Sequence, residues 1–143
     1  MKITQISVFL ENKKGRLYDA IRVLGEKGID IKTLTIAENE DFGVLRMIVD
    51  KPQEAMEILK VHEFIASITD IVAIEVDDHP GGLAKVLKVL DENKVNIEYM
   101  YAFVEKRANK AILVFRFDDL DKAIAVLAKN SIRVIGGKDI GNL

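Results

Sequence analysis

The sequence contains no cysteine and no tryptophan, and only two prolines and two histidines. Without cysteine the chain has no disulfide, no thiolate metal site and no cysteine nucleophile. The two histidines occupy unrelated positions and no catalytic triad or acid pair is recognisable, so we expect neither enzymatic activity nor a metal or cofactor. The apolar runs are too short to span a bilayer, and Met1–Gln5 begins a strand-like alternation rather than a signal peptide. We therefore expect a cytoplasmic protein that does not bind membranes.

An excess of charge of one sign is also missing. Lys and Arg number 21 against 23 Asp and Glu, which gives a formal net charge of -2. This balance does not suit a general polyanion binder, so we expect no nucleic-acid partner. The hydrophobic fraction of 49% and the charged fraction of 31% are typical of a folded domain. With 143 residues the chain can form one ordinary domain or two very small ones.

The chain contains an internal repeat. Leu17, Ala20, Ile21 and Leu24 have the spacing of one apolar helix face, and the same pattern returns at Leu83, Val86, Leu87 and Leu90. The register differs by about 66 residues there and by about 68 further on, where Asp50 corresponds to Asp118. The sequence therefore predicts two domains, residues 1–69 and 70–143.

Each half predicts the order strand, helix, strand, strand, helix, strand. In the first half we expect strands at 4–10, 31–37, 43–49 and 65–68, a helix that follows the polar loop with Gly15 and runs to about Lys27, and a helix from Pro52 to about Val61. In the second half we expect strands at 71–76, 97–104, 110–117 and 132–135, and helices at 82–92 and 120–129. The fold class is thus α+β: two ferredoxin-like βαββαβ domains in tandem, each with two helices on one face of an antiparallel sheet.

Two segments of the second half carry a recognisable motif. Asp78-His79-Pro80-Gly81-Gly82-Leu83 joins a strand to a helix, and Val95-Asn96-Ile97 leads into the next strand. Here the sequence resembles the ACT domain, a small-molecule-binding regulatory module of amino-acid metabolism with a D/N-x-P-G-x-L loop and a V/I-N-I turn. The first half fits less well, because Asn12, Gly15, Leu17 and Ile29-Asp30-Ile31 match but Lys14 replaces the proline. The resemblance covers nearly the whole chain. The chain as a whole resembles free-standing proteins that consist of two ACT domains in tandem.

The resemblance implies a non-catalytic regulatory or sensor protein that holds an amino acid in the loop between the first strand and first helix, at an interface between two such domains. The candidate ligand-binding residues are Asp78, His79, Pro80, Gly81, Gly82, Leu83, Asn96 and Ile97 in the second half, and Asn12, Lys14, Gly15, Arg16, Leu17 and Asp30 in the first. Physical chemistry supports this independently. The N-terminus of a helix attracts an α-carboxylate, and Asp78 can accept hydrogen bonds from an α-ammonium group.

Other interpretations stay open. Asp78 also suits a helix cap, and Pro80 and Gly81 suit a turn without any ligand. A protein-interaction module that binds no metabolite is a second possible function. RNA binding is a third, although residues 71–76 lack the aromatic side chains on which RNA-recognition motifs stack bases. We also expect a homodimer with a regulated protein partner that the sequence does not identify.

Overall fold

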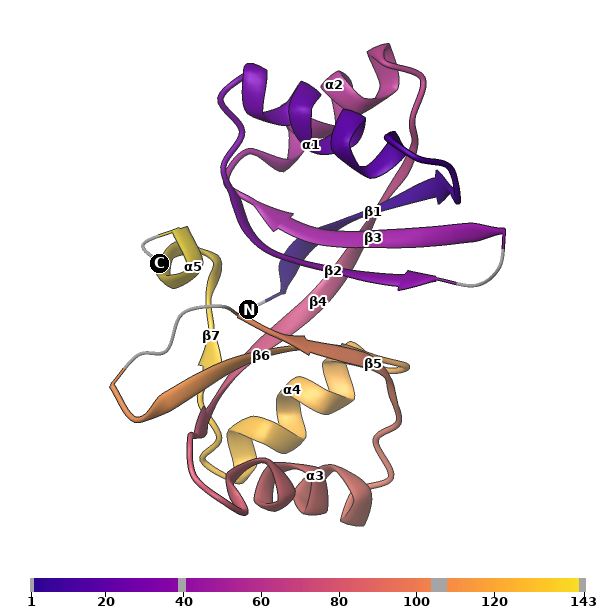
Figure 1. The fold of residues 1–143 in the computed structure, drawn as a ribbon. Coiled ribbons are helices and arrows are strands. Elements are labelled where there is room, and N and C mark those ends of the chain that lie inside the picture. Colours follow the sequence, from indigo (N-terminus) through magenta and orange to yellow (C-terminus); the bar gives the residue numbers. More distant parts are fainter. Residues whose placement is uncertain (1, 39–40, 104–107, 142–143) are drawn as a thin grey trace. The chain divides into compact units, whose positions relative to one another are not determined.

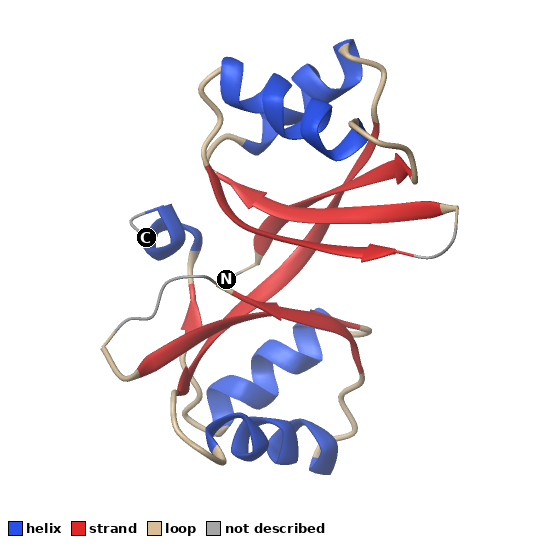
Figure 2. Ribbon diagram, in the orientation of Figure 1, coloured by secondary structure: helices blue, strands red, loops and turns tan. Residues whose placement is uncertain are grey.

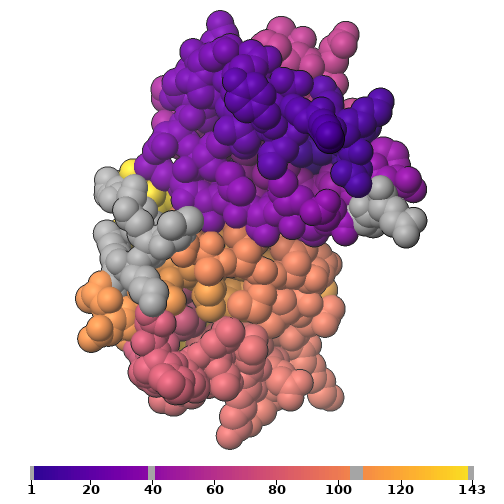
Figure 3. All heavy atoms as spheres, viewed as in Figure 1, coloured from indigo at the N-terminus to yellow at the C-terminus, as the bar shows by residue number. Residues whose placement is uncertain are grey.

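The computed structural model describes residues 2–38, 41–103 and 108–141 of the chain. These residues divide into two compact units, one of Thr4–Thr69 and another that begins at Asp70 and includes Ile3. In each unit two long helices cover one face of an antiparallel sheet (Figures 1 and 2), and Figure 3 shows the heavy atoms of the chain from the same side. The α+β fold class with two ferredoxin-like βαββαβ motifs is confirmed. Within the described residues, no helix has the length and apolar character needed to cross a membrane.

The first unit consists of six elements: β1 (Ile3–Glu11), α1 (Arg16–Glu26), β2 (Ile31–Glu38), β3 (Phe42–Val49), α2 (Pro52–Val61) and the first part of β4 (Ile65–Asp77). The strands lie in the order β2-β3-β1-β4, and β3 runs antiparallel to both β1 and β2. Gly28, at φ 76°, follows α1 and makes the reversal into β2, as its place after the helix predicts.

The second unit repeats this arrangement with the rest of β4, α3 (Gly82–Glu92), β5 (Ile97–Ala102), β6 (Lys110–Phe117), α4 (Leu120–Lys129), β7 (Val134–Ile135) and α5 (Gly137–Gly141). The order β5-β6-β4-β7 matches the order in the first unit, element for element. Both β5 and β4 pair antiparallel with β6, and the short β7 lies at the other edge of β4.

Each unit has its own apolar core between helices and sheet. In the first unit Leu24 and Leu59, from the two helices, are fully buried with Leu45 of β3. In the second unit Phe115 and Phe117 share the helix-facing side of β6, and their rings stack with centroids 5.4 Å apart. The alternating apolar side chains of β6 and the apolar stripes of the helices therefore face the core, as their periodicities predict. Leu17 is the exception, since it begins the first stripe and is 41% exposed.

Three element boundaries differ from the sequence-based expectations. Residues 65–68 and 71–76 were expected as two strands, but β4 is one strand of 13 residues. The last strand, expected at 132–135, contains only Val134 and Ile135, and the short helix α5 was not expected. The end of the strand expected at 97–104 and part of the loop expected between β2 and β3 lie outside the described residues.

Candidate ligand-binding site

The two strand-to-helix loops share the conformation of the glycine that precedes the helix. Gly15 precedes α1 and Gly81 precedes α3, both with φ 87° in the left-handed region. In each loop the first candidate residue is tied to the neighbouring hairpin: the Asn12 amide donates to Asp41 O (3.0 Å), and the Asp78 amide donates to Asn109 O (2.8 Å). The loop conformation therefore does not depend on Pro80, which is lysine in the first unit.

The two glycines of the second loop have different structural roles. A Cβ placed on Gly81 would meet nothing within 4 Å, so this glycine is explained by its positive φ. A Cβ on Gly82 would lie 1.9 Å from the Asp77 carbonyl oxygen. Close packing of α3 on β4 thus accounts for Gly82 without a ligand, whereas the open space beside Gly81 leaves ligand approach as a prediction. The equivalent of Gly82 is Arg16, whose guanidinium lies 4.4 Å from the Phe64 ring centroid.

The second motif segment lies away from this loop. The amide of Asn96 donates to the Asp118 carboxylate (3.3 Å), and the Asp118 amide donates to the Asn96 carbonyl (3.2 Å). The same reciprocal pair joins Asp30 and Asp50 in the first unit. Asn96 and Ile97 follow the C-terminus of α3, whereas residues 78–83 precede and begin it. Eleven helical residues rise about 16 Å, so within one unit a single amino acid does not touch both segments.

A cavity of about 340 Å³ lies beside the second loop. Its walls are the end of β4, one side of α3 and the segment 130–133 that leads into β7. Val76, Val86 and Val89 supply apolar surface, while charged groups come from Glu75, Asp77, Lys85, Lys110 and Arg133. Of the residues singled out as ligand-binding from the sequence, only Gly82 lines this cavity.

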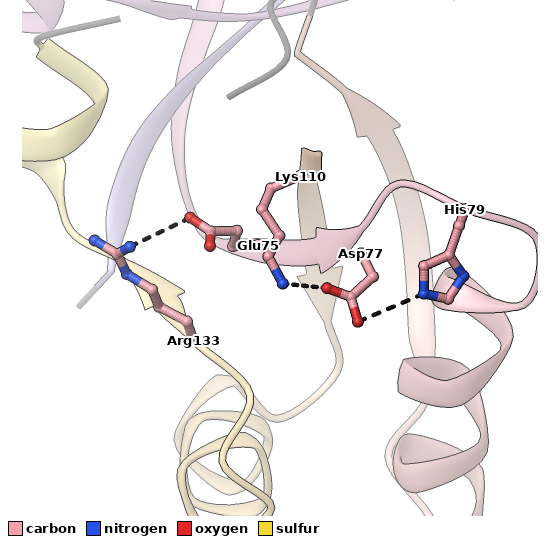
Figure 4. A network of polar contacts seen from close by, with 5 residues as sticks. All are labelled: Glu75, Asp77, His79, Lys110 and Arg133. Atoms are coloured by element: carbon pink, nitrogen blue, oxygen red, sulfur yellow. Dashed lines mark hydrogen bonds and ion pairs between the residues drawn. The ribbon is translucent and has the colours of Figure 1, made fainter. Parts of the chain in front are cut away.

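The charged side chains of β4 make two separate sets of polar contacts (Figure 4). Asp77 is ion-paired with Lys110, and its other carboxylate oxygen lies 3.7 Å from Nε2 of His79. The hydrogen bond from Lys110 holds the pKa of Asp77 below its usual value, and Asp77 in turn raises the pKa of Lys110. Arg133 lies 3.4 Å from Glu75. The cavity thus combines three cationic side chains with two carboxylates on one strand, a set that can bind both an anionic and a cationic group.

Four of the five charged positions differ in the first unit, while Asp77 corresponds to the acidic Glu11. By the repeat register, Phe9 stands for Glu75, Asp19 for Lys85, Phe42 for Lys110 and Ile65 for Arg133. The strand registers agree, because Phe9 pairs with Val44 as Glu75 pairs with Ile112. In the first unit the three apolar replacements line a groove of about 570 Å³ instead. These charged residues are not part of the pattern that the two halves share, so the repeat does not mark them as candidates, although the sequence shows where the halves differ.

Comparison with known proteins assigns the family. A family model for the ACT domain pair matches residues 1–143. The chain belongs to the ACT domain family. The resemblance inferred from the loop and turn motifs is therefore confirmed, and since ACT domains are regulatory modules the family is regulatory rather than catalytic in character.

Solved structures agree with this assignment. The protein BT0572 from Bacteroides thetaiotaomicron is 43% identical over 100% of this chain and 98% of its own, with a TM-score of 0.94. The ligand-free regulatory subunit of aspartate kinase from Thermus thermophilus is 17% identical over 88% of this chain and 91% of its own, with a TM-score of 0.65. Its counterpart from Thermus flavus has a TM-score of 0.60 at 17% identity over 88% of this chain and 90% of its own. The two subunits show the shared fold. No curated protein sequence is significantly similar to the chain.

Proposed function

We propose that this ACT domain pair is a non-catalytic sensor that binds an amino acid at the second unit and regulates another protein in response. The observation that carries the proposal is the juxtaposition of a helix N-terminus, carboxylates and cations around one cavity. Every free α-amino acid presents a carboxylate and an ammonium group together. A site for this ligand class therefore needs both kinds of partner within a few ångströms of each other.

The second loop and the start of α3 offer one partner for each of the two charged groups of an amino acid. Asp78 is exposed in the loop next to Asp77, which lines the cavity, and its carboxylate can accept from an α-ammonium group, while the start of α3 favours an α-carboxylate. The first loop has the same left-handed glycine before its helix but a neutral Asn12 in place of Asp78. We therefore expect the second unit to bind the amino acid more tightly than the first.

A thermal-shift screen with the common L-amino acids tests the proposal. A ligand that prefers the native state raises the melting temperature, by an amount that grows with its concentration. Calorimetry then compares the unaltered protein with Asp78→Asn, a replacement whose loop geometry is already seen at Asn12. We expect at least about tenfold weaker binding, the scale of one charge-assisted hydrogen bond.

A matched control is Asp91→Asn, which removes an exposed carboxylate from the other end of α3. It should bind the amino acid as the unaltered protein does. Failure of every amino acid to raise the melting temperature would refute the proposed function. Equal losses in the two variants would show instead that Asp78 does not contact the ligand.

A specific observation favours protein contact as a second candidate function. Phe9, Phe42 and Ile65 of the first unit are 49%, 53% and 72% exposed around their groove. Exposed apolar clusters of this kind are typical of protein-interaction surfaces, which agrees with the expected homodimer. Sedimentation of Phe42→Glu beside the unaltered protein tests it: loss of a dimer supports contact through this groove, and an unchanged dimer places the contact elsewhere.

A further inference from the structure

We infer that the amino acid bound by the second unit has an apolar side chain, which takes the place that the Phe64 side chain fills in the first unit, an inference that rests on the proposed amino-acid-binding function. The cavity has a volume of about 340 Å³, near the lower end of small-molecule pockets, which begin at roughly 300 Å³. This size suits an amino acid rather than a nucleotide. The side chains that form its walls then restrict the ligand further.

The first unit has two large side chains at the positions that line this cavity in the second. The Arg16 guanidinium lies 4.4 Å from the ring centroid of Phe64, and Phe64 is buried in the core of the first unit. By the repeat register, Gly82 stands for Arg16 and Ile132 for Phe64. The backbone agrees for the second pair, because each of the two amides donates to a carbonyl in the last turn of the preceding helix, at 2.9 Å and 3.0 Å.

The second unit thus lacks two large side chains at the walls of its cavity. Gly82 has no side chain, as the close packing of α3 on β4 requires, and Ile132 is smaller than phenylalanine. Val86 is larger than its counterpart in the first unit but returns only part of this volume. The same difference is seen at Val89, which is half-buried and lines the cavity, whereas its counterpart Val23 is only 2% exposed in the core of the first unit.

The smaller residues leave an apolar wall uncovered. Val86 and Val89 contribute one face of α3 to this wall, and Ile132 contributes to it from the segment before β7. Val86 lies one helical turn, about 6 Å, from Gly82 at the start of α3. An amino acid whose α-carboxylate is held at the start of α3 can therefore extend its side chain along this wall. Burial against these residues favours an apolar side chain, because a polar one would lose hydrogen bonds to water and gain none from them.

The charged groups beside the cavity do not favour a charged side chain. They comprise three cationic side chains and, with Asp139 at 3.9 Å from Arg133, three carboxylates, so their formal charges cancel. An amino acid with an uncharged side chain is a neutral zwitterion and preserves this balance.

Titration calorimetry with amino acids of matched shape tests the inference. L-leucine and L-asparagine have side chains of similar shape and opposite polarity, as do L-valine and L-threonine, and L-phenylalanine extends the series in size. We expect L-leucine or L-phenylalanine to be the tightest ligand, and L-leucine to bind at least about tenfold tighter than L-asparagine. Since the first unit fills the equivalent space with its own side chains, one such site per chain is expected.

Ile132→Phe gives the second unit the residue that the first unit has at this position. The phenyl ring should fill the cavity and weaken the tightest apolar ligand at least about tenfold. The fold should tolerate the ring, because the first unit accommodates it at Phe64. The matched control is Ile132→Leu, which keeps the volume of the side chain and should change the affinity by less than about threefold.

The outcomes separate this inference from the function on which it rests. Polar amino acids that bind as tightly as their apolar counterparts, or an Ile132→Phe protein that binds as the unaltered protein does, would overturn the apolar assignment and leave amino-acid sensing intact. Absence of any amino-acid binding would refute both. The comparison of L-leucine with L-asparagine uses the unaltered protein, so it remains decisive even if Ile132→Phe does not fold.

Discussion

Replacement of Gly82 by alanine tests the packing of α3 on the sheet. The new Cβ would lie 1.9 Å from the Asp77 carbonyl oxygen and 3.0 Å from the Asp77 carbonyl carbon. Ordinary van der Waals contact begins at 3.4 Å, so the two backbones must separate by about 1.5 Å. The obstacle is main chain within a β-strand, which cannot rotate away as a side chain can. We expect a cost of about 3 kcal/mol, the upper end of the usual penalty for overpacking.

Urea unfolding followed by far-ultraviolet circular dichroism measures this cost. With an m-value of about 2 kcal/mol/M, the transition of the second unit should move down by about 1.5 M. The control is Gly25→Ala in α1, where a Cβ meets nothing within 4 Å. That change should stabilise the first unit by up to about 0.5–1 kcal/mol, because alanine favours the helix. A Gly82→Ala protein as stable as the unaltered one would refute the assignment of Gly82 to helix–strand packing.

Three further perturbations have expected outcomes. Gly15→Ala and Gly81→Ala should each lower the free energy of unfolding by about 1–2 kcal/mol, because both residues have φ 87° and open space around them. The two losses, measured by denaturation, should be equal, and unequal losses would contradict a purely backbone origin. Asp119→Ala should cost about 1 kcal/mol, because the Asp119 carboxylate caps α4 by accepting from the Lys122 amide at 3.1 Å, and an unchanged urea midpoint would rule this out. Lowering the pH should remove the contribution of Asp77 to the free energy of unfolding, because Lys110 depresses the pKa of Asp77 in the folded state. This contribution is fully present above the usual aspartate pKa and is lost as the pH falls through the lowered pKa. Lys110→Met should therefore flatten the dependence of melting temperature on pH in the acid range, and an identical pH profile would contradict the pairing.

Much of the fold could be predicted because the two halves have the same fold and repeat the same sequence pattern. A single apolar stripe at Leu83–Leu90 is weak evidence for a helix, but its recurrence at a fixed offset is strong evidence. Pro52 and Gly82 begin helices at the expected residues because their backbone preferences act locally. Local signals also explain the error at β4. Thr69 and Asp70 lie between the two expected strands at the expected domain boundary, yet neither residue imposes a turn, and β4 continues through both.

The candidate site was only partly predictable. The loop at residues 78–83 was found because glycine and proline mark it in the sequence, and Asn96 because it belongs to the same family motif. The loop at residues 78–83 and Asn96 lie at opposite ends of α3, and a sequence motif does not show this distance. Glu75, Lys110 and Arg133 come from three distant strands or loops and meet only through the strand pairing of β4 with β6 and the arrival of the segment before β7. No local pattern marks such a convergence.

The duplication separates positions that maintain the fold from positions that are free to specialise. Gly15 with Gly81, and the reciprocal bonds of Asp30–Asp50 with those of Asn96–Asp118, have the same geometry in both units. Such positions maintain the fold, since each half needs the same turns. Near the end of β4, Glu75, Lys110 and Arg133 of the second unit stand where the first unit has the exposed Phe9, Phe42 and Ile65, while Asp77 keeps an acidic counterpart in Glu11. Because the shared fold is stable with either chemistry, stability alone does not require the charged cavity. The proposed binding of an amino acid at the second unit would account for these charges, and the Asp78→Asn calorimetry tests that proposal.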